Sequence, residues 1–492
     1  MSFEDSSSCG HSPFTDTALG DAMTPVTVAV GAAILLLVLL AIRTPVAIAL
    51  LTAGGLGLLL LDGFTIATGS IGRLTYSSVG RTSLLIIPMF VAMGLLAQYA
   101  GLATRAFLVA RKLTVRLPAG LGIGTIMACA GFAAVSGSSI ATVATVGRIA
   151  ITEMRKHGYS KKLAAGLVAA AGTLGVLIPP SLFLVIYGIV SQQSIGRLLI
   201  AGIIPGIVSA LAYAAAMLIV GWRRPAAVGG VVHSVTSGGS ATNPGSATVD
   251  PASDDQDPPA SLDRDALAVS AGTYASVFLQ ISFLFILVVG GVYFGFYTAT
   301  EAGALGALGA VVLVLYAKWR GGGQALKALK DAGISTVEIT SMVFALIIGA
   351  AVFTSLMTTA RIPVRMTEGI LGLPVSPYLI VILLLLALVP LGMFLDGISI
   401  MLLITPIAHP VVTALGFDGL WFGILMVKMI EVGMVTPPLG VNAFVVAGVS
   451  RDISVGDVFQ GVSLFLIIDA IVIALIVAMP GLVTWLPQLM RG

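Results

Sequence analysis

The chain alternates long apolar runs with short polar or basic stretches, and many runs have about the 20 residues that a helix needs to cross a bilayer. Because both halves of the chain repeat this pattern, we predict an all-α polytopic membrane protein. The predicted spans are 24–42, 45–61, 82–100, 163–191, 198–221, 269–296, 298–317, 333–358, 418–449 and 456–487.

Two pairs of shorter apolar runs have the pattern of re-entrant helical hairpins. The first hairpin, at about 118–154, is interrupted by Ser136-Gly137-Ser138-Ser139 and has basic residues at both ends. The second, at about 376–413, is interrupted by Asp396-Gly397-Ile398-Ser399. Glycine lets a chain reverse sharply, so these interruptions are the predicted hairpin tips.

Each half also has a Pro-Pro pair inside an apolar span, at Pro179-Pro180 (span 163–191) and at Pro437-Pro438 (span 418–449). Proline lacks the backbone donor and clashes with the preceding turn, so each helix must break. The offset between the pairs is 437 − 179 = 258. Matching broken helices in two halves indicate a transporter's binding site, where freed carbonyls can ligate Na⁺. The alternative is a pair of structural kinks.

Between the halves, residues 222–268 are rich in Ser, Thr, Gly, Pro and Asp. Such a segment cannot bury a core, and we predict a disordered linker. The organisation is then a polar N-terminal extension (1–22), a first repeat (23–221), the linker and a second repeat (269–492). The extension lacks the basic start of a signal peptide, and Met23 is a candidate start of translation.

The distribution of basic residues predicts the orientation, because cytoplasmic loops carry more Lys and Arg. With the stretch 105–116 in the cytoplasm, 17 of the 25 Lys and Arg residues lie on the cytoplasmic side of the membrane and six on the external side. The other two, Arg148 and Lys428, lie within predicted spans. The external ones are Arg73, Arg81, Arg197, Arg361, Arg365 and Arg491. The linker is then cytoplasmic, and the two hairpins open to opposite sides. We therefore predict inverted-topology repeats.

Composition agrees with a membrane protein and excludes several functions. Hydrophobic residues make up 58% of the chain and charged residues 10%, whereas soluble domains have about 25% charged residues. Cys9 and Cys129 form no disulfide framework, and the four histidines do not cluster. No phosphate-binding loop indicates ATP hydrolysis. We expect no enzyme activity, no cofactor and no nucleic-acid partner, because no catalytic dyad or metal cluster has suitable spacing.

Polar residues inside the apolar segments are the remaining candidates. The tip serines can ligate an ion or cap helix ends, and the two roles are compatible. Lys428 and Glu431 are three residues apart on one predicted helix, which predicts a buried ion pair. Asp396 lies at the second tip and is a candidate site residue. Asn442 needs partners, which are a substrate carboxylate, a sodium shell or a neighbouring helix.

Together these features resemble the large membrane subunit (DctM-like, M subunit) of tripartite ATP-independent periplasmic (TRAP) transporters, over residues 23–221 and 269–487. One departure is Ala299, where the family usually has proline, and another is the long linker. The motifs are Ser136-Gly-Ser-Ser-Ile-Ala-Thr142, Gly158-Tyr159, Ala171-Gly-Thr-Leu-Gly-Val-Leu-Ile-Pro-Pro-Ser181, Tyr187-Gly188, Ala201-Gly-Ile-Ile-Pro-Gly206, Thr298-Ala-Thr-Glu-Ala302, Gly392-Met-Phe-Leu-Asp-Gly397, Thr405-Pro406 and Thr436-Pro-Pro-Leu-Gly-Val-Asn442.

The resemblance implies a sodium-coupled symporter that imports an organic acid, such as a C4-dicarboxylate, across the bacterial inner membrane. It implies a scaffold, an elevator-type transport domain, a small four-helix membrane subunit (Q type) and a periplasmic substrate-binding protein (P type). A stand-alone sodium-coupled dicarboxylate carrier or ion antiporter of the same superfamily is the alternative. Carried over by position, the resemblance implies two sodium sites and a substrate site. The first sodium site comprises Ser136, Ser138, Ser139 and Gly175, and the second comprises Asp396, Gly397, Ser399, Gly433 and Thr436. The substrate site comprises Ser138, Pro180 and Asn442.

Overall fold

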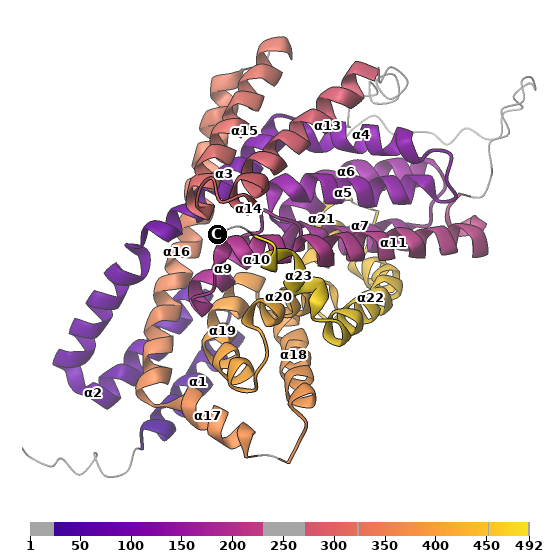
Figure 1. Cartoon of the computed structure of the whole chain (residues 1–492). Coiled ribbons are helices and arrows are strands. Elements are labelled where there is room, and N and C mark those ends of the chain that lie inside the picture. Colours follow the sequence, from indigo (N-terminus) through magenta and orange to yellow (C-terminus); the bar gives the residue numbers. More distant parts are fainter. Residues whose placement is uncertain (1–23, 230–270, 322–323, 373, 451, 491–492) are drawn as a thin grey trace, which may run out of the picture. The chain divides into compact units, whose positions relative to one another are not determined.

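The computed structural model describes residues 24–229, 271–321, 324–372, 374–450 and 452–490 (Figure 1). These residues form helices and no strand, and one isolated bridge joins Tyr159 and Val228. The predicted N-terminal extension and residues 230–268 of the predicted linker lie outside the described residues. At 222–229 the chain completes helix α11 (Ile203–Arg223) and a short 3-10 helix, η2 (Pro225–Ala227).

The chain divides into two compact units. The first contains the described residues up to Val79 together with Ala345–Gly372. Within it, α2 packs closely on α16, because a Cβ added at Gly54 would lie 2.7 Å from the Phe353 Cα atom. Its helices are α1 (Pro25–Ala41), α2 (Val46–Val79), the last part of α16 (Ala325–Thr359) and α17 (Ile362–Leu371).

The second unit, Gly80–Phe344 with Leu373–Gly492, contains both predicted hairpins and both broken helices. Its helices before residue 230 are η1 (Thr82–Leu85), α3 (Ile86–Tyr99), α4 (Leu102–Thr114), α5 (Gly120–Ser136), α6 (Ser139–Lys156), α7 (Lys161–Gly172), α8 (Leu174–Leu177), α9 (Leu182–Ser191), α10 (Ile195–Ala201), α11 and η2. The later ones are α13 (Ala271–Phe285), η3 (Ile286–Gly290), α14 (Gly291–Tyr293), α15 (Ala299–Gly321), the start of α16, α18 (Pro377–Phe394), α19 (Gly397–Ala414), α20 (Gly419–Val435), α21 (Val441–Val449), α22 (Val455–Ala478) and α23 (Gly481–Gln488).

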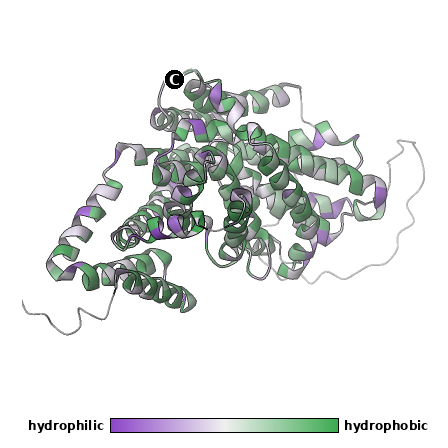
Figure 2. Cartoon of the chain, turned by 60° about the horizontal axis from the view of Figure 1, so that its bottom comes forward, coloured by the Kyte–Doolittle hydropathy of each residue, from purple (hydrophilic) through white to green (hydrophobic). Residues whose placement is uncertain are grey.

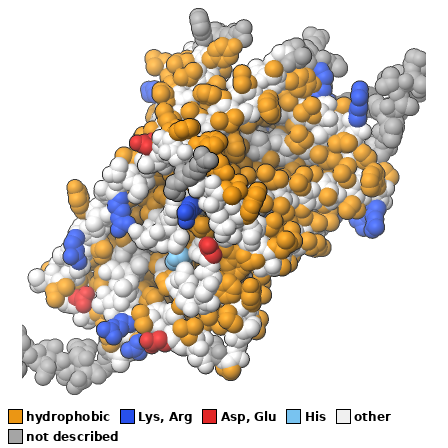
Figure 3. Space-filling view, in the orientation of Figure 1, with side chains coloured by type: hydrophobic (Ala, Val, Ile, Leu, Met, Phe, Trp, Pro, Cys, Tyr) orange, Lys and Arg blue, Asp and Glu red, His pale blue; other side chains and the backbone are white. Residues whose placement is uncertain are grey.

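Nine helices of the described chain are long and apolar enough to cross a membrane, and the bent pair Lys161–Leu177 with Leu182–Ser191 gives a tenth span. Hydrophobic residues dominate most helices in Figure 2, and charged side chains are few and scattered on the face shown in Figure 3. Large apolar side chains such as Leu211 and Ile467 are exposed. An apolar exterior over long apolar helices is the arrangement of a multi-pass membrane protein, as predicted.

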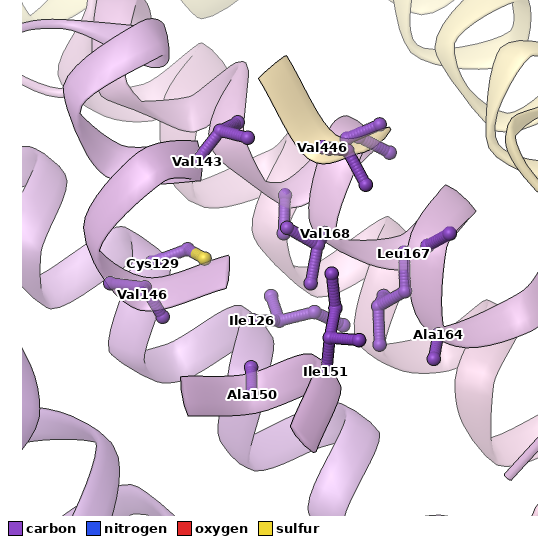
Figure 4. Close-up of a cluster of buried hydrophobic side chains, with 14 of the residues drawn as sticks. Ile126, Cys129, Val143, Val146, Ala150, Ile151, Ala164, Leu167, Val168 and Val446 are labelled. Atoms are coloured by element: carbon purple, nitrogen blue, oxygen red, sulfur yellow. The ribbon is translucent and has the colours of Figure 1, made fainter. Parts of the chain in front are cut away.

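The interior of the second unit joins elements from the two halves of the sequence. Figure 4 shows buried side chains of α5, α6, α7 and α21 packed together, among them Cys129, Val143, Val168 and Val446. Val446 lies on α21, after the second Pro-Pro pair, whereas the other three belong to the first half. The end of the second broken helix therefore packs directly against the first hairpin.

Corresponding helices of the two halves keep one offset. Helices α6 and α19 begin at Ser139 and Gly397, where 397 − 139 = 258, and they end at Lys156 and Ala414, where 414 − 156 = 258. The same difference separates the start of α7 from the start of α20, and the end of α8 from the end of α20. The offset seen between the proline pairs thus extends over whole helices.

Some predicted boundaries differ from the structure. The span 45–61 continues as α2 to Val79, past a non-helical residue, Gly63. The span 456–487 divides into α22 and α23, which Met479 and Pro480 separate. The hydrophobic pattern does not predict helix α17, because this helix has only 10 residues and carries Arg365 and Glu368 among its apolar positions.

Candidate ion and substrate site

The first predicted tip is a tight turn between two helices. Helix α5 ends at Ser136, and Gly137 has a φ of 62°, a left-handed conformation that favours glycine. The Ser138 hydroxyl accepts a hydrogen bond from the Ala141 backbone amide at 3.3 Å and caps α6. The expected capping role of a tip serine is therefore confirmed.

This tip lies against the first Pro-Pro break. The Leu182 amide donates to the Gly137 carbonyl at 3.4 Å, and the Pro180 carbonyl lies beside Gly137. A Cβ atom at Gly175 would lie 2.8 Å from the Ser138 carbonyl oxygen, so only glycine allows this approach. The structure thus brings together Ser138, Gly175 and Pro180, which the sequence assigned to the first sodium site and the substrate site.

Several oxygen atoms gather at the tip. The Ser138 carbonyl accepts hydrogen bonds from the Thr142 hydroxyl at 2.8 Å and from the Thr142 amide at 3.1 Å. The Ser136 and Thr142 hydroxyl oxygens are 3.1 Å apart. Thr142 is a residue that the sequence pattern did not single out as a ligand. Its position one turn after Ser138 in an apolar helix was the available signal, because Thr hydroxyls bond the carbonyl four residues earlier.

The second tip uses a carboxylate for the same task. Asp396 caps α19, and its carboxylate accepts hydrogen bonds from the Ser399 amide at 3.0 Å and from the Ser399 hydroxyl. Gly397 packs against the Phe183 ring of α9 and against Ile430 of α20. Since 396 − 138 = 258, the two capping residues occupy corresponding places in the two halves.

The second break differs from the first in exposure. Helix α20 ends at Val435, and the Thr436 hydroxyl donates to the Val432 carbonyl at 2.5 Å. Pro437 and Pro438 are exposed, whereas the first pair is buried. Both Pro-Pro peptide bonds are cis.

Close packing places the second break beside the second hairpin. A Cβ atom at Gly433 would lie 2.8 Å from the Gly392 Cα atom, so α20 and α18 touch at these two residues. Gly433 and Gly397 thus both lie at contacts of α20 with the second hairpin. The hydrogen bonds of Thr436 and of Asp396 stay within their own helix ends and do not join the two residues.

Glu431 connects the first hairpin to the second broken helix. Its carboxylate accepts hydrogen bonds from the Ser139 hydroxyl at 3.0 Å and from the Asn442 amide nitrogen at 3.4 Å. All three residues are buried. Of the alternatives for Asn442, the structure shows hydrogen bonding to a neighbouring helix. The amide oxygen of Asn442 has no hydrogen-bond partner among the described residues.

The predicted Lys428–Glu431 ion pair is wrong. The Lys428 ammonium instead contacts an Asp469 carboxylate oxygen of α22 at 2.5 Å. The Tyr213 hydroxyl donates to the same oxygen at 2.6 Å and lies 3.4 Å from the Thr173 hydroxyl. Spacing along one helix could not reveal a partner on another helix.

The family described as "Tripartite ATP-independent periplasmic transporter, DctM component" matches residues 33–482. The C4-dicarboxylate TRAP transporter large permease protein DctM of Vibrio cholerae is 30% identical over 93% of this chain and 97% of its own length. The sialic acid TRAP transporter large permease protein SiaM of the same organism is 30% identical over 87% and 93%. The isethionate TRAP transporter permease protein DctMQ of Oleidesulfovibrio alaskensis is 31% identical over 84% of this chain, which spans 59% of that longer relative.

Solved structures share the fold at low sequence identity. The Alcanivorax borkumensis YdaH transporter has a TM-score of 0.58 and 13% identity, over 93% of this chain and 98% of that one. Neisseria gonorrhoeae MtrF, from a class of antimetabolite efflux pumps, has a TM-score of 0.55 and 12% identity, over 94% and 96%. These two similarities concern the fold alone.

Proposed function

The chain belongs to the family of DctM components of tripartite ATP-independent periplasmic transporters, and on this premise we propose that it imports an organic acid across the bacterial inner membrane in symport with sodium. The observation that carries the proposal is the contact between the first hairpin tip and the first break, where Gly175 admits the Ser138 carbonyl. Unwound backbone at membrane depth is tolerated where it lines a site.

We further propose that the two halves of the second unit form inverted repeats of an elevator-type transport domain. The constant offset between α6 and α19 and between α7 and α20 supports this arrangement. So does the equal capping role of Ser138 and Asp396. The first unit is the candidate for part of the scaffold.

Two sodium ions would bind at the two tips. The first ion would use the oxygens of Ser136, Ser138 and Ser139 beside Gly175, and Thr142 adds another hydroxyl at this place. The second would use the chain around Asp396, Gly397 and Ser399, with Gly433 and Thr436 of α20 opposite. Hard cations prefer oxygen ligands such as carbonyl, hydroxyl and carboxylate oxygens.

The substrate would be a small carboxylate that binds between the tips, near Ser138, Pro180 and Asn442. Two relatives are named for C4-dicarboxylate and for sialic acid, which supports an organic acid. The partners would be a small four-helix membrane subunit and a periplasmic binding protein. The name DctMQ of one longer relative is consistent with the first of these.

The membrane potential is sufficient to drive such a cycle. Two sodium ions with one monoanion move one net positive charge, which is worth about 2.3 kcal/mol per 100 mV. At about 1.4 kcal/mol per tenfold change, this alone supports roughly 50-fold accumulation.

Proteoliposomes that contain this chain and its small membrane partner test the proposal. We expect uptake only with an inward sodium gradient and a loaded binding protein. Uptake driven by a proton gradient in sodium-free buffer would refute sodium coupling. Uptake without a binding protein would instead favour the stand-alone carrier.

Two substitutions at the first tip test the site itself. Ser138→Ala or Gly175→Val should weaken the sodium dependence of uptake without preventing membrane insertion. Because Ser138→Ala also removes a helix cap, worth about 1 kcal/mol, Ser160→Ala is the matched control. Ser160 caps α7 through the Leu163 amide at 3.3 Å and lies outside the proposed sites. Wild-type sodium dependence in both tip variants would show that the site assignment is wrong.

A further inference from the structure

Glu431 carries a carboxylate in the interior of the second unit and forms no ion pair among the described residues. The residue is 1% exposed. The basic residue one turn earlier, Lys428, directs its ammonium to Asp469, and the ion pairs of the described residues do not include Glu431. Two neutral groups, the Ser139 hydroxyl and the Asn442 amide, donate hydrogen bonds to the carboxylate. An ionised carboxylate away from water is costly unless a positive charge compensates it.

Asn442 provides a second, independent observation. Its amide oxygen is buried and has no hydrogen-bond partner within the described part of the chain, and the residue is 0% exposed. A buried polar atom without a partner is unusual and calls for an unseen ligand. Rotation of the Asn442 side-chain amide by about 180° would also exchange the positions of its oxygen and nitrogen atoms. Either orientation leaves one end of Asn442 without a partner while the other faces Glu431.

We propose that Glu431, Asn442 and Ser139 form a third cation site, which adjoins the first tip site at Ser139 and is distinct from the second tip site. A sodium ion there would neutralise the Glu431 carboxylate and give the Asn442 oxygen a partner. With the amide rotated, the site presents two carboxylate oxygens, an amide oxygen and a hydroxyl oxygen, all of which are suitable for a hard cation. The proposal rests on the proposed function in one respect, the identity of the ion as sodium.

The position of the site gives the ion a mechanical role. Ser139 is the first residue of α6, at the first tip, whereas Glu431 and Asn442 lie on α20 and α21, on either side of the second break. A bound ion therefore ties the first hairpin to the second broken helix.

Equilibrium binding of radioactive sodium to the purified full-length chain tests the site, with choline keeping the ionic strength constant. We expect Glu431→Gln and Asn442→Leu each to bind one ion fewer than the wild type. In sodium-free buffer Glu431→Gln should melt at a higher temperature than the wild type, because glutamine avoids the cost of burying a carboxylate that forms no ion pair. Sodium should then raise its melting temperature by less, since a ligand stabilises only the protein that binds it.

Glu153→Gln is the matched control. Glu153 is also a buried glutamate of the second unit, but Arg111 at 2.7 Å and Lys156 at 3.4 Å compensate its charge. This variant should be less stable than the wild type and bind the same number of sodium ions. Full sodium stoichiometry in Glu431→Gln would overturn the third site alone. No sodium binding by the wild type would overturn the coupling ion as well.

Discussion

Lys428 and Asp469 are both about 1% exposed and form an ion pair in the interior of the second unit. Removing one partner of such a pair leaves a buried charge, which costs about 3–5 kcal/mol. We therefore expect Lys428→Met to lower the free energy of unfolding by that amount. The double variant Lys428→Met with Asp469→Leu should recover most of it, because apolar residues can replace a buried pair. Thermal unfolding of the purified protein measures both changes.

The control for this prediction is an ion pair near the surface. The Lys156 side chain is 49% exposed and lies 3.4 Å from Glu153, so Lys156→Met should change stability by about 0–1 kcal/mol. If the double variant were as unstable as Lys428→Met, the cost would come from lost packing around Lys428 and not from the unpaired charge.

The same residues show what spacing can and cannot predict. The caps at Ser138 and Asp396 depend on residues three positions away, and the sequence pattern located both tips correctly. The partners of Lys428 and Glu431 lie on other helices, at Asp469 and Ser139. Such contacts depend on how helices pack, and the helical periodicity of one segment contains no information about them.

At the scale of elements, the contact between α7 and α22 relies on two small residues. A Cβ atom at Gly461 would overlap the Lys162 carbonyl, and one at Gly166 would overlap the Gly461 backbone. Gly461→Ala must push the helices apart, and overpacking of this kind costs about 1–3 kcal/mol. We expect a lower unfolding temperature, measured on the purified protein by differential scanning fluorimetry.

Gly448→Ala is the matched helical control. A Cβ atom at Gly448, near the end of α21, has nothing within 4 Å. Alanine there should leave stability unchanged or raise it by up to about 1 kcal/mol, because it lowers the entropy of the unfolded chain. An equal loss of stability in both variants would argue against close packing of α7 and α22.

Hydrophobic runs predicted most elements because the bilayer requires long apolar helices. The predicted hairpins and broken helices all appear, with ends within a few residues of the observed ones. The failures occur where length and hydrophobicity are weak signals. Gly63 interrupts α2 without ending it, and α17 is too short to stand out.

At the scale of the molecule, the constant offset between the two halves was visible in the proline pairs, and the structure extends it to whole helices. The sequence predicts that the linker between the halves is cytoplasmic, and this prediction depends on the orientation that the basic residues indicate. Labelling from one side of the membrane measures that orientation directly. Helix α16 is suited to this experiment, because its two ends lie on opposite sides in the predicted topology.

Helix α16 has 35 residues, and at 1.5 Å per residue it is about 52 Å long, more than the roughly 30 Å of the hydrocarbon core. Lys327 near its start and Thr359 at its end are both exposed. In a variant with Cys9 and Cys129 replaced by serine, we expect a membrane-impermeant maleimide to label Thr359→Cys in intact cells. It should label Lys327→Cys only after lysis, because basic residues concentrate on the cytoplasmic side. The opposite labelling pattern would invert the whole molecule and place the predicted linker outside. It would also exchange the sides to which the two hairpins open, so a periplasmic binding protein would face the first hairpin instead of the second.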